Sequence, residues 1–291
     1  MLIPILAARS GWHTDELVRA LAGAGHDGVV VRYEDLAARA GCASGLRSGT
    51  VDIGTAPAVL ARIIPAGSLE QIIYRVDALH WLEDRGVRVV NSPRTIERTV
   101  DKFYTTALLE QAGLPTPATR VAESVDDALA GFREFGDIIV KPLFGSMGLG
   151  MVRVSDEDTA WRVFRAIEAV RGVFYIQRVV EHGGRDLRAF VVGDRVIGAI
   201  ERRSPGWRTN VSRGGRPTAV ELPPVWAELA VRAAHAVGAQ YAGVDLLPGP
   251  NGSVYVLEVN GIPGWRGLQS ATGVDVAAAI VRQLLDAHDA R

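Results

Sequence analysis

The stretch Val254-Tyr255-Val256-Leu257-Glu258-Val259-Asn260, with its upstream partner Tyr241-Ala242-Gly243-Val244-Asp245-Leu246-Leu247, decides the fold. Both runs are rich in β-branched and aromatic residues, which is typical of β-strands. Asn251 and Gly252 stand between the two runs, and Asn-Gly is the strongest short signal for a hairpin turn. The sequence therefore predicts an antiparallel hairpin with these two residues at the centre of its turn.

This hairpin brings three oxygen-bearing side chains together. Antiparallel pairing sets Asp245 directly opposite Glu258, and the two-residue period of a strand places Asn260 on the same face as Glu258. Two adjacent carboxylates repel each other unless a positive group lies between them. Ligands of this kind suit Mg²⁺, which proteins hold through one or two carboxylates together with substrate phosphates. Taken alone, a solvated hairpin face with scattered polar residues is an equal alternative.

A glycine-rich segment far upstream favours the metal interpretation. The strand-like run Asp137-Ile138-Ile139-Val140-Lys141 leads into a segment with Gly145, Gly148 and Gly150. Glycines let backbone N–H groups approach an anion closely, and a lysine at a strand end supplies a point charge for phosphate. No Gly-Lys-Ser/Thr closes the loop, so this is not the Walker pattern. A plain glycine hairpin is the alternative, but the preceding lysine favours phosphate binding.

Composition excludes several classes of protein. The chain has 291 residues, of which 48% are hydrophobic and 22% charged, which is ordinary for a soluble globular enzyme with two or three lobes. A formal net charge of −1 gives no sign of a nucleic-acid or membrane partner. Cys42 is the single cysteine, so neither an intramolecular disulfide nor a cysteine zinc site can form. With no apolar run long enough to span a bilayer, we expect a cytoplasmic protein.

The first 93 residues alternate between strand and helix patterns, which predicts a small α/β unit with a parallel sheet. Gln71–Arg75 is a further strand candidate, and residues 57–68 are rich in turn formers and fit no element. Asn91-Ser92-Pro93 interrupts the chain. The pattern then predicts one helix over residues 95–112, which carries Asp101-Lys102.

Two later segments place charged residues on strand faces. Asp186 and Arg188 share a face of one predicted strand, which suits either a substrate contact or an ordinary cross-strand charge pair. Arg208 and Asn210 alternate onto one face in the same way. From these segments alone, both interpretations stay open.

In sequence order, these motifs resemble the ATP-grasp superfamily in its RimK-like branch of glutamate ligases. The resemblance covers nearly the whole chain and rests on Asp101-Lys102, Lys141 with its glycine loop, Gln177, Arg185-Asp186-Leu187-Arg188, Arg208-Thr209-Asn210, Gly243-Val244-Asp245 and Glu258-Val259-Asn260-x-x-Pro263-Gly264. It implies a fold of mixed α/β and α+β class. A pre-ATP-grasp α/β domain would occupy residues 1–93, and an ATP-grasp domain residues 94–291. The two lobes of the latter, roughly 94–178 and 179–291, would grip ATP between them.

The resemblance also assigns roles to residues. It implies that the hinge at Gln177, Arg178 and Val179 meets adenine, and that Asp186 lies at the ribose. The residues implied to contact the phosphates, or to belong to the glycine loop around the phosphates, are Lys102, Lys141, Gly145, Ser146, Gly148, Gly150 and Arg208. The catalytic set implied is Lys141, Arg188, Arg208 and Asn210, and the metal ligands implied are Asp245, Glu258 and Asn260.

The implied activity is an ATP-dependent carboxylate–amine ligase that forms an acyl-phosphate and releases ADP and phosphate. Its cofactors would be ATP and two Mg²⁺ ions, with Mn²⁺ as a substitute. The implied substrates are a small-molecule carboxylate, of the tetrahydromethanopterin or methanofuran type, and L-glutamate. Trp265-Arg266 replaces a pair familiar from ribosomal-protein-modifying relatives, which disfavours a protein C-terminal tail as substrate. A non-catalytic ATP-binding regulatory subunit is a further alternative, and a homodimer or a homotetramer is open.

Overall fold

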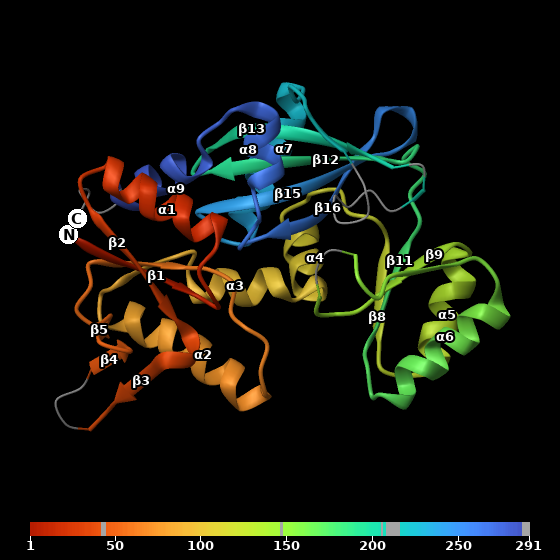
Figure 1. Ribbon diagram of the computed structural model, residues 1–291. Coiled ribbons are helices and arrows are strands. Elements are labelled where there is room, and N and C mark those ends of the chain that lie inside the picture. The colour runs from red at the N-terminus through yellow and green to blue at the C-terminus, as the bar shows by residue number, and fades with distance from the viewer. Residues whose placement is uncertain (42–44, 146–147, 205, 208–215, 287–291) are drawn as a thin grey trace.

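The computed structural model describes residues 1–41, 45–145, 148–204, 206–207 and 216–286. Four sheets lie in this part of the chain (Figure 1): an N-terminal parallel sheet with its helices, a three-stranded antiparallel sheet within the same N-terminal unit, a small antiparallel sheet of four strands covered by two helices, and a larger antiparallel sheet of five strands. No helix within the described residues is long and apolar enough to cross a membrane.

The N-terminal sheet has the strand order β2-β1-β6-β7, and its strands run parallel, as the alternating pattern predicts. Its elements are β1 (Leu2–Ala7), α1 (Trp12–Gly23), β2 (Asp27–Arg32), β6 (Ala58–Ala61), α2 (Leu69–Asp84) and β7 (Arg88–Val90). A 3₁₀ turn η1 (Tyr33–Asp35) leads into a separate three-stranded antiparallel sheet, formed by β3 (Leu36–Arg39), β4 (Gly45–Ser48) and β5 (Val51–Asp52).

Two expectations for this unit are wrong. Gln71–Arg75 lies inside helix α2, and β6 lies within the turn-rich segment that fitted no element. The β-branched residues Ile72 and Ile73 favoured a strand, yet they are 40% and 49% exposed on the outer face of the helix. Ser68 starts α2 by accepting a hydrogen bond from the N–H of Gln71, and such a cap outweighs the small propensity cost of isoleucine.

The helix predicted over residues 95–112 is two helices, α3 (Pro93–Val100) and α4 (Lys102–Gln111). Asp101 separates them and caps α4 by accepting a hydrogen bond from the N–H of Tyr104 at 3.0 Å. The break sets Lys102 in the first turn of α4, a helix that lies near the centre of the molecule (Figure 1).

The small antiparallel sheet has the order β10-β9-β11-β8. Its elements are β8 (Thr119–Ala122), α5 (Val125–Phe135), β9 (Ile138–Lys141), β10 (Val152–Val154), α6 (Glu157–Ala169) and β11 (Phe174–Arg178). Helices α5 and α6 pack on one face (Figure 1), where Phe132, Phe164 and Phe174 form part of a buried core. The other face is left for the functional site.

The larger antiparallel sheet has the order β14-β13-β12-β15-β16. Its strands and the helices around them are β12 (Arg185–Val192), β13 (Arg195–Arg203), β14 (Arg216–Ala219), α7 (Pro224–Ala236), β15 (Tyr241–Pro248), β16 (Val254–Asn260), α8 (Arg266–Thr272) and α9 (Val276–Asp286). Alternate residues of β12 face different cores. Ala189 packs in the core under α7, whereas Phe190 packs with Ile3, Ile5 and Ile280. The N-terminal sheet and the larger sheet therefore share one hydrophobic core.

The hairpin of β15 and β16 pairs Asp245 with Glu258, as the sequence predicts. Asn251 and Gly252 lie at the centre of the turn, with φ of 58° and 77°. Positive φ at both central residues is the conformation that favours Asn-Gly in two-residue hairpin turns.

The register nevertheless shifts twice along this hairpin. Pro250, in the 3₁₀ turn η3 (Pro250–Gly252), has no N–H and cannot complete the hydrogen bonds of a two-residue turn. The N–H of Gly249 instead donates to the carbonyl of Ser253 at 2.9 Å, which displaces the pairing by one residue. A bulge at Leu257, which no residue opposes, restores the predicted register before Glu258.

Candidate active site

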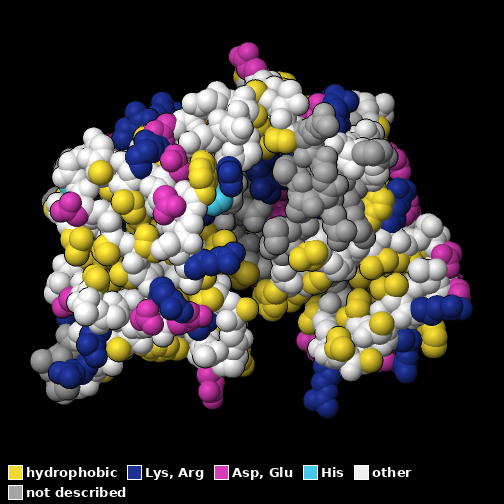
Figure 2. Space-filling view, in the orientation of Figure 1, with side chains coloured by type: hydrophobic (Ala, Val, Ile, Leu, Met, Phe, Trp, Pro, Cys, Tyr) yellow, Lys and Arg dark blue, Asp and Glu magenta, His cyan; other side chains and the backbone are white. Residues whose placement is uncertain are grey.

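A cavity of about 440 Å³ lies between the small antiparallel sheet and the larger one, and Figure 2 shows the surface hollowed at its centre. The predicted site residues that line it are Lys102, Lys141, Gly145, Gly148, Gln177, Arg178, Val179, Asp186, Asp245 and Glu258. Arg188 and Asn260 do not line the cavity, but each contacts a carboxylate that does: Arg188 contacts Asp245, and Asn260 contacts Glu258. Ser146, Arg208 and Asn210 lie outside the described residues, as does Cys42.

Lys141 is the last residue of β9 and is buried, with 7% of its surface exposed. Its ammonium donates to Oε1 of Gln177 at 2.5 Å and lies 5.8 Å from the ring centre of Tyr175. Burial, aided by the charge of Lys102, lowers the pKa of Lys141 to about 8, although Glu258 acts in the opposite direction. An ammonium in such a place gains strongly from an anion such as phosphate.

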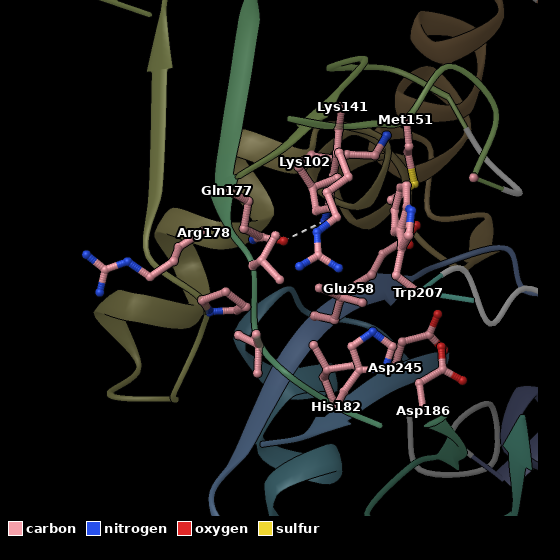
Figure 3. Close-up of a pocket in the computed structure, with 18 of the residues that line it drawn as sticks. Lys102, Lys141, Met151, Gln177, Arg178, His182, Asp186, Trp207, Asp245 and Glu258 are labelled. Atoms are coloured by element: carbon pink, nitrogen blue, oxygen red, sulfur yellow. Dashed lines mark hydrogen bonds between the residues drawn. The ribbon is translucent and has the colours of Figure 1, made fainter. Parts of the chain in front are cut away.

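Gln177 is a support for Lys141 (Figure 3). Its Nε2 donates to Oγ1 of Thr119 at 3.0 Å and to the hydroxyl of Tyr175 at 3.3 Å. The Tyr175 hydroxyl lies 2.9 Å from Oγ1 of Thr106, which itself donates to the carbonyl of Lys102. Because Thr106 donates to a carbonyl, the Tyr175 hydroxyl must donate to Thr106 and accept from Gln177. The side-chain amide of Gln177 therefore turns its nitrogen toward Tyr175 and its oxygen toward the ammonium of Lys141.

Lys102 holds the glycine loop. Its ammonium donates to the carbonyls of Leu143 and Gly145 at 3.3 and 2.8 Å. Gly150 has φ of +74°, and a Cβ there would lie 2.8 Å from Cγ of Pro142. Glycine is therefore required at this position by the backbone and by close packing.

At the hinge, the side chain of Arg178 points away from the cavity (Figure 3), and its guanidinium stacks over Phe135 at 5.1 Å. The N–H groups of Arg178 and Val179 are bonded to the carbonyls of Ala118 and Asp137. Only backbone atoms of Arg178 are thus suited to contact a ligand in the cavity.

Asp186 and Arg188 both form cross-strand charge pairs. Arg202 on β13 donates to both oxygens of Asp186, at 2.6 and 2.7 Å, and Arg188 donates to both oxygens of Asp245, each at 2.7 Å. Arg202 also reaches Asp245 at 3.0 Å, which joins the four groups into one ladder across three strands. Burial alone would raise the pKa of Asp245, but the two arginines outweigh it and hold this pKa at about 2.

Glu258 differs from its partner on the hairpin. It is half-buried, faces the cavity and forms no ion pair with the described residues. With its amide nitrogen turned toward this carboxylate, Asn260 donates to Glu258 at 3.3 Å and accepts from Arg188 at 3.2 Å. Among the described residues, no group of three acidic, histidine or cysteine side chains is arranged to hold a metal ion. A cation here would use oxygens of Glu258 and share Asp245 with its arginines, and Asn260 would have to turn its oxygen from Arg188 toward the cation. Oxygen ligands of this kind suit a hard ion such as Mg²⁺.

Sequence reasoning missed several residues of the site. His182, Met151 and Trp207 line the cavity (Figure 3), and the ring of His182 lies 3.1 Å from the carbonyl of Arg185 through Nδ1. Tyr175 could have been found, because it precedes Gln177 by two residues and therefore shares its strand face. The others lie on loops, where no period indicates the direction of a side chain.

The described geometry agrees with a known family. Residues 99–284 match the model of the RimK-like ATP-grasp domain, which is more than half of the chain. The chain belongs to the RimK-like ATP-grasp family. Among its relatives, the tetrahydromethanopterin:α-L-glutamate ligase of Methanosarcina acetivorans is 35% identical over 82% of each chain. The enzyme of the same name from Methanococcus maripaludis is 33% identical over 98% of each chain.

Solved ATP-grasp structures share the fold of this ATP-grasp protein. The ATP-grasp ligase PsnB, in complex with a minimal precursor, Mg and ADP, has a TM-score of 0.76 at 23% identity, over 99% of this chain and 98% of that one. The family and the mixed helix and sheet architecture expected from the sequence are thus confirmed. The ATP-grasp protein is a ligase that forms a C–N bond, and its family uses ATP and a divalent metal.

Proposed function

We propose that this ATP-grasp ligase joins L-glutamate to a small-molecule carboxylate, of the tetrahydromethanopterin or methanofuran type, with release of ADP and phosphate. The names of the two tetrahydromethanopterin:α-L-glutamate ligases support the choice of glutamate and of an acceptor of the tetrahydromethanopterin type. The observation that carries the proposal is the single cavity in which Lys102 and Lys141 face Glu258 beside the glycine loop. Lysines that can hold phosphate, opposite a carboxylate that can hold a divalent metal ion, are parts that recur in phosphoryl-transfer sites.

The chemistry follows from the weakness of a carboxylate as an electrophile. A carboxylate oxygen attacks the γ-phosphorus of ATP, and the bond to ADP breaks. The amine then attacks the carbonyl carbon, loses a proton and expels phosphate, which carries away the former carboxylate oxygen. Because the mixed anhydride hydrolyses readily, it has to form where water is excluded. The segment from Gly145 to Gly150 is the proposed lid over the cavity.

Each part of the site has a role in this scheme. Lys141 and Lys102 hold the phosphates, Arg188 and Arg208 neutralise charge on the transferring group, and Asn210 orients it. Asp245, Glu258 and Asn260 would hold two Mg²⁺ ions, or Mn²⁺ in their place. When bound, these ions would neutralise charge on the transferring phosphate. The proposed catalytic unit spans residues 94–291, and residues 1–93 form the preceding α/β unit.

Isotope transfer tests the proposal. The enzyme is incubated with ATP, L-glutamate and a candidate carboxylate that carries ¹⁸O in its carboxyl group. We expect ADP together with inorganic phosphate that contains one ¹⁸O atom for each amide formed. Formation of AMP, or of amide without label in phosphate, would exclude the acyl-phosphate route. ATP turnover that needs no amine would indicate a kinase. The absence of ATP turnover with every acceptor tested would indicate a regulatory subunit.

A further inference from the structure

A buried arginine that pairs with none of the described carboxylates lies outside the cavity of the candidate active site. Arg62 follows β6 and is 4% exposed. Its guanidinium donates to the hydroxyl of Tyr241 and to the carbonyl of Pro263, each at 3.0 Å, and stacks over Trp265 at 4.7 Å. Its partners are neutral, and none of the described carboxylates pairs with it. A buried cation is costly unless an anion compensates it.

His13, in the first turn of α1, adds a donor at the same place. Its Nε2 accepts the N–H of Trp265 at 3.1 Å, so its proton resides on Nδ1. Burial and the charges of Arg62 and Arg266 lower the pKa of His13 to about 4, which keeps the ring neutral at pH 7. The neutral ring presents an N–H that no described acceptor takes.

Arg266 completes a group of donors with no acid among them. Its guanidinium is exposed and lies 5.7 Å from the ring of Trp12, and the indole N–H of Trp265 is buried without an acceptor among the described residues. Basic and histidine side chains lie together on the surface beside α1 (Figures 1 and 2). An excess of donors and positive charge predicts an anion that the chain does not supply itself.

This group lies next to the reacting centre. The side chains of Pro263 and Arg188 both approach Gly243, where an added Cβ would lie 3.0 Å from the first and 3.7 Å from the second. Arg188 in turn contacts Asp245 and Asn260. Pro263, whose carbonyl accepts from Arg62, thus lies between Arg62 and the proposed catalytic Arg188.

We propose that Arg62, His13 and Arg266 bind the side-chain carboxylate of an acidic amino acid, the amine donor of the ligase reaction. This inference rests on the proposed function and deepens it, because it names the residues that select glutamate over uncharged amino acids. The amine then lies toward Arg188 and the acyl-phosphate, while the side-chain carboxylate lies in the group of donors. The N-terminal unit thereby contributes Arg62 and His13 to substrate selection.

Substitution of the exposed Arg266 tests the site with little risk to folding. We measure KM for ATP, for the carboxylate acceptor, and for L-glutamate and L-glutamine as donors, in Arg266→Gln and in His13→Gln. The latter keeps an acceptor for the N–H of Trp265. Loss of a charged hydrogen bond should raise KM for L-glutamate about tenfold or more and leave KM for ATP within about twofold. Because glutamine lacks the side-chain charge, the preference for glutamate should fall by a similar factor.

Arg162→Gln, on the exposed face of α6, is the matched control and should behave as wild type. Equal losses for glutamate and glutamine, a change confined to the acceptor's KM, or no change in an active variant would each overturn the inference and leave the ligase assignment intact. Should no amide form with any amino acid, the proposed function fails by itself. Calorimetric binding of L-glutamate against L-glutamine to wild type and Arg266→Gln, with a non-hydrolysable ATP analogue and Mg²⁺, then decides the inference. Equal binding of both amino acids would reject it.

Discussion

Glu258 and Asp245 are paired on the hairpin but differ in their partners. Asp245 is held by two arginines, whereas Glu258 has no ion pair among the described residues. Both Glu258→Gln and Asp245→Asn should lower kcat about 100-fold or more, the usual effect of removing a group that stabilises transferring charge. Only Asp245→Asn should lower stability, by about 3–5 kcal/mol, because it leaves Arg188 without its counter-ion and removes one of the two that Arg202 has. Steady-state kinetics with urea unfolding separates the two effects, and near-normal turnover of Glu258→Gln at saturating Mg²⁺ would contradict the metal assignment.

Lys141 predicts an alkaline limit on ATP capture. With a pKa lowered to about 8, its ammonium is fully present below that pH and is lost above it. We expect kcat/KM for ATP to fall with this pKa, whereas kcat should fall at higher pH because bound triphosphate favours the ammonium. Gln177→Leu removes the oxygen at 2.5 Å and should move the kcat/KM limit to lower pH, while Gln177→Glu should move it to higher pH. Identical pH profiles in all three proteins would show that Gln177 does not support Lys141.

The sequence indicates which residues carry the charge but not how they are held. Lys141, Asp245 and Glu258 could be predicted because a strand end and a strand pair define where their side chains point. The ladder of Asp186 with Arg202 could not, because Arg202 is one of many arginines and only the register of β12 against β13 selects it. The proposed role of Arg62 could not be predicted from the sequence, because it depends on the three-dimensional finding that none of the described carboxylates pairs with this buried arginine.

At the scale of elements, the glycine loop offers a matched pair of substitutions. Gly150 and Gly113 have φ of +74° and +67°, so alanine should strain either backbone by roughly 1 kcal/mol. Only at position 150 does the new Cβ also approach Pro142, at 2.8 Å, next to Lys141. We expect Gly150→Ala to raise KM for ATP several-fold, and Gly113→Ala to leave it unchanged. Nucleotide titrations of both variants provide the measurement, and equal affinities would show that the loop tolerates the shift.

Element prediction succeeded where turn chemistry and strand pattern agreed, as in the hairpin of β15 with β16. It failed at α2, where isoleucines on an exposed helical face imitated a strand, and at β6, whose four apolar residues are too few to show a period. Such cases are settled by tertiary packing, because β6 is recognised only as the neighbour of β1 and β7.

At the scale of the whole molecule, the cavity lies between two sheets, so ligands should stabilise the protein as a unit. A non-hydrolysable ATP analogue at about 100 times its Kd should add about 2.7 kcal/mol, which for a chain of this length is a rise in Tm of roughly 4 °C. Chelation of Mg²⁺ should remove most of this increase in wild type. In Glu258→Gln the increase should be small with or without chelator. Thermal scans with and without EDTA provide the test, and a full increase in the absence of metal would argue against Glu258 as a ligand.

The hairpin of β15 and β16 has a practical consequence for protein engineering. Its exposed tip is separated from the two carboxylates by the bulge at Leu257, and β15 is anchored to β12 from Tyr241 to Leu246 independently of the tip. A peptide tag or a fluorophore-bearing segment grafted between Asn251 and Gly252 should therefore leave the spacing of Asp245 and Glu258 intact. Such a graft would place a reporter at the edge of the catalytic sheet in a working enzyme.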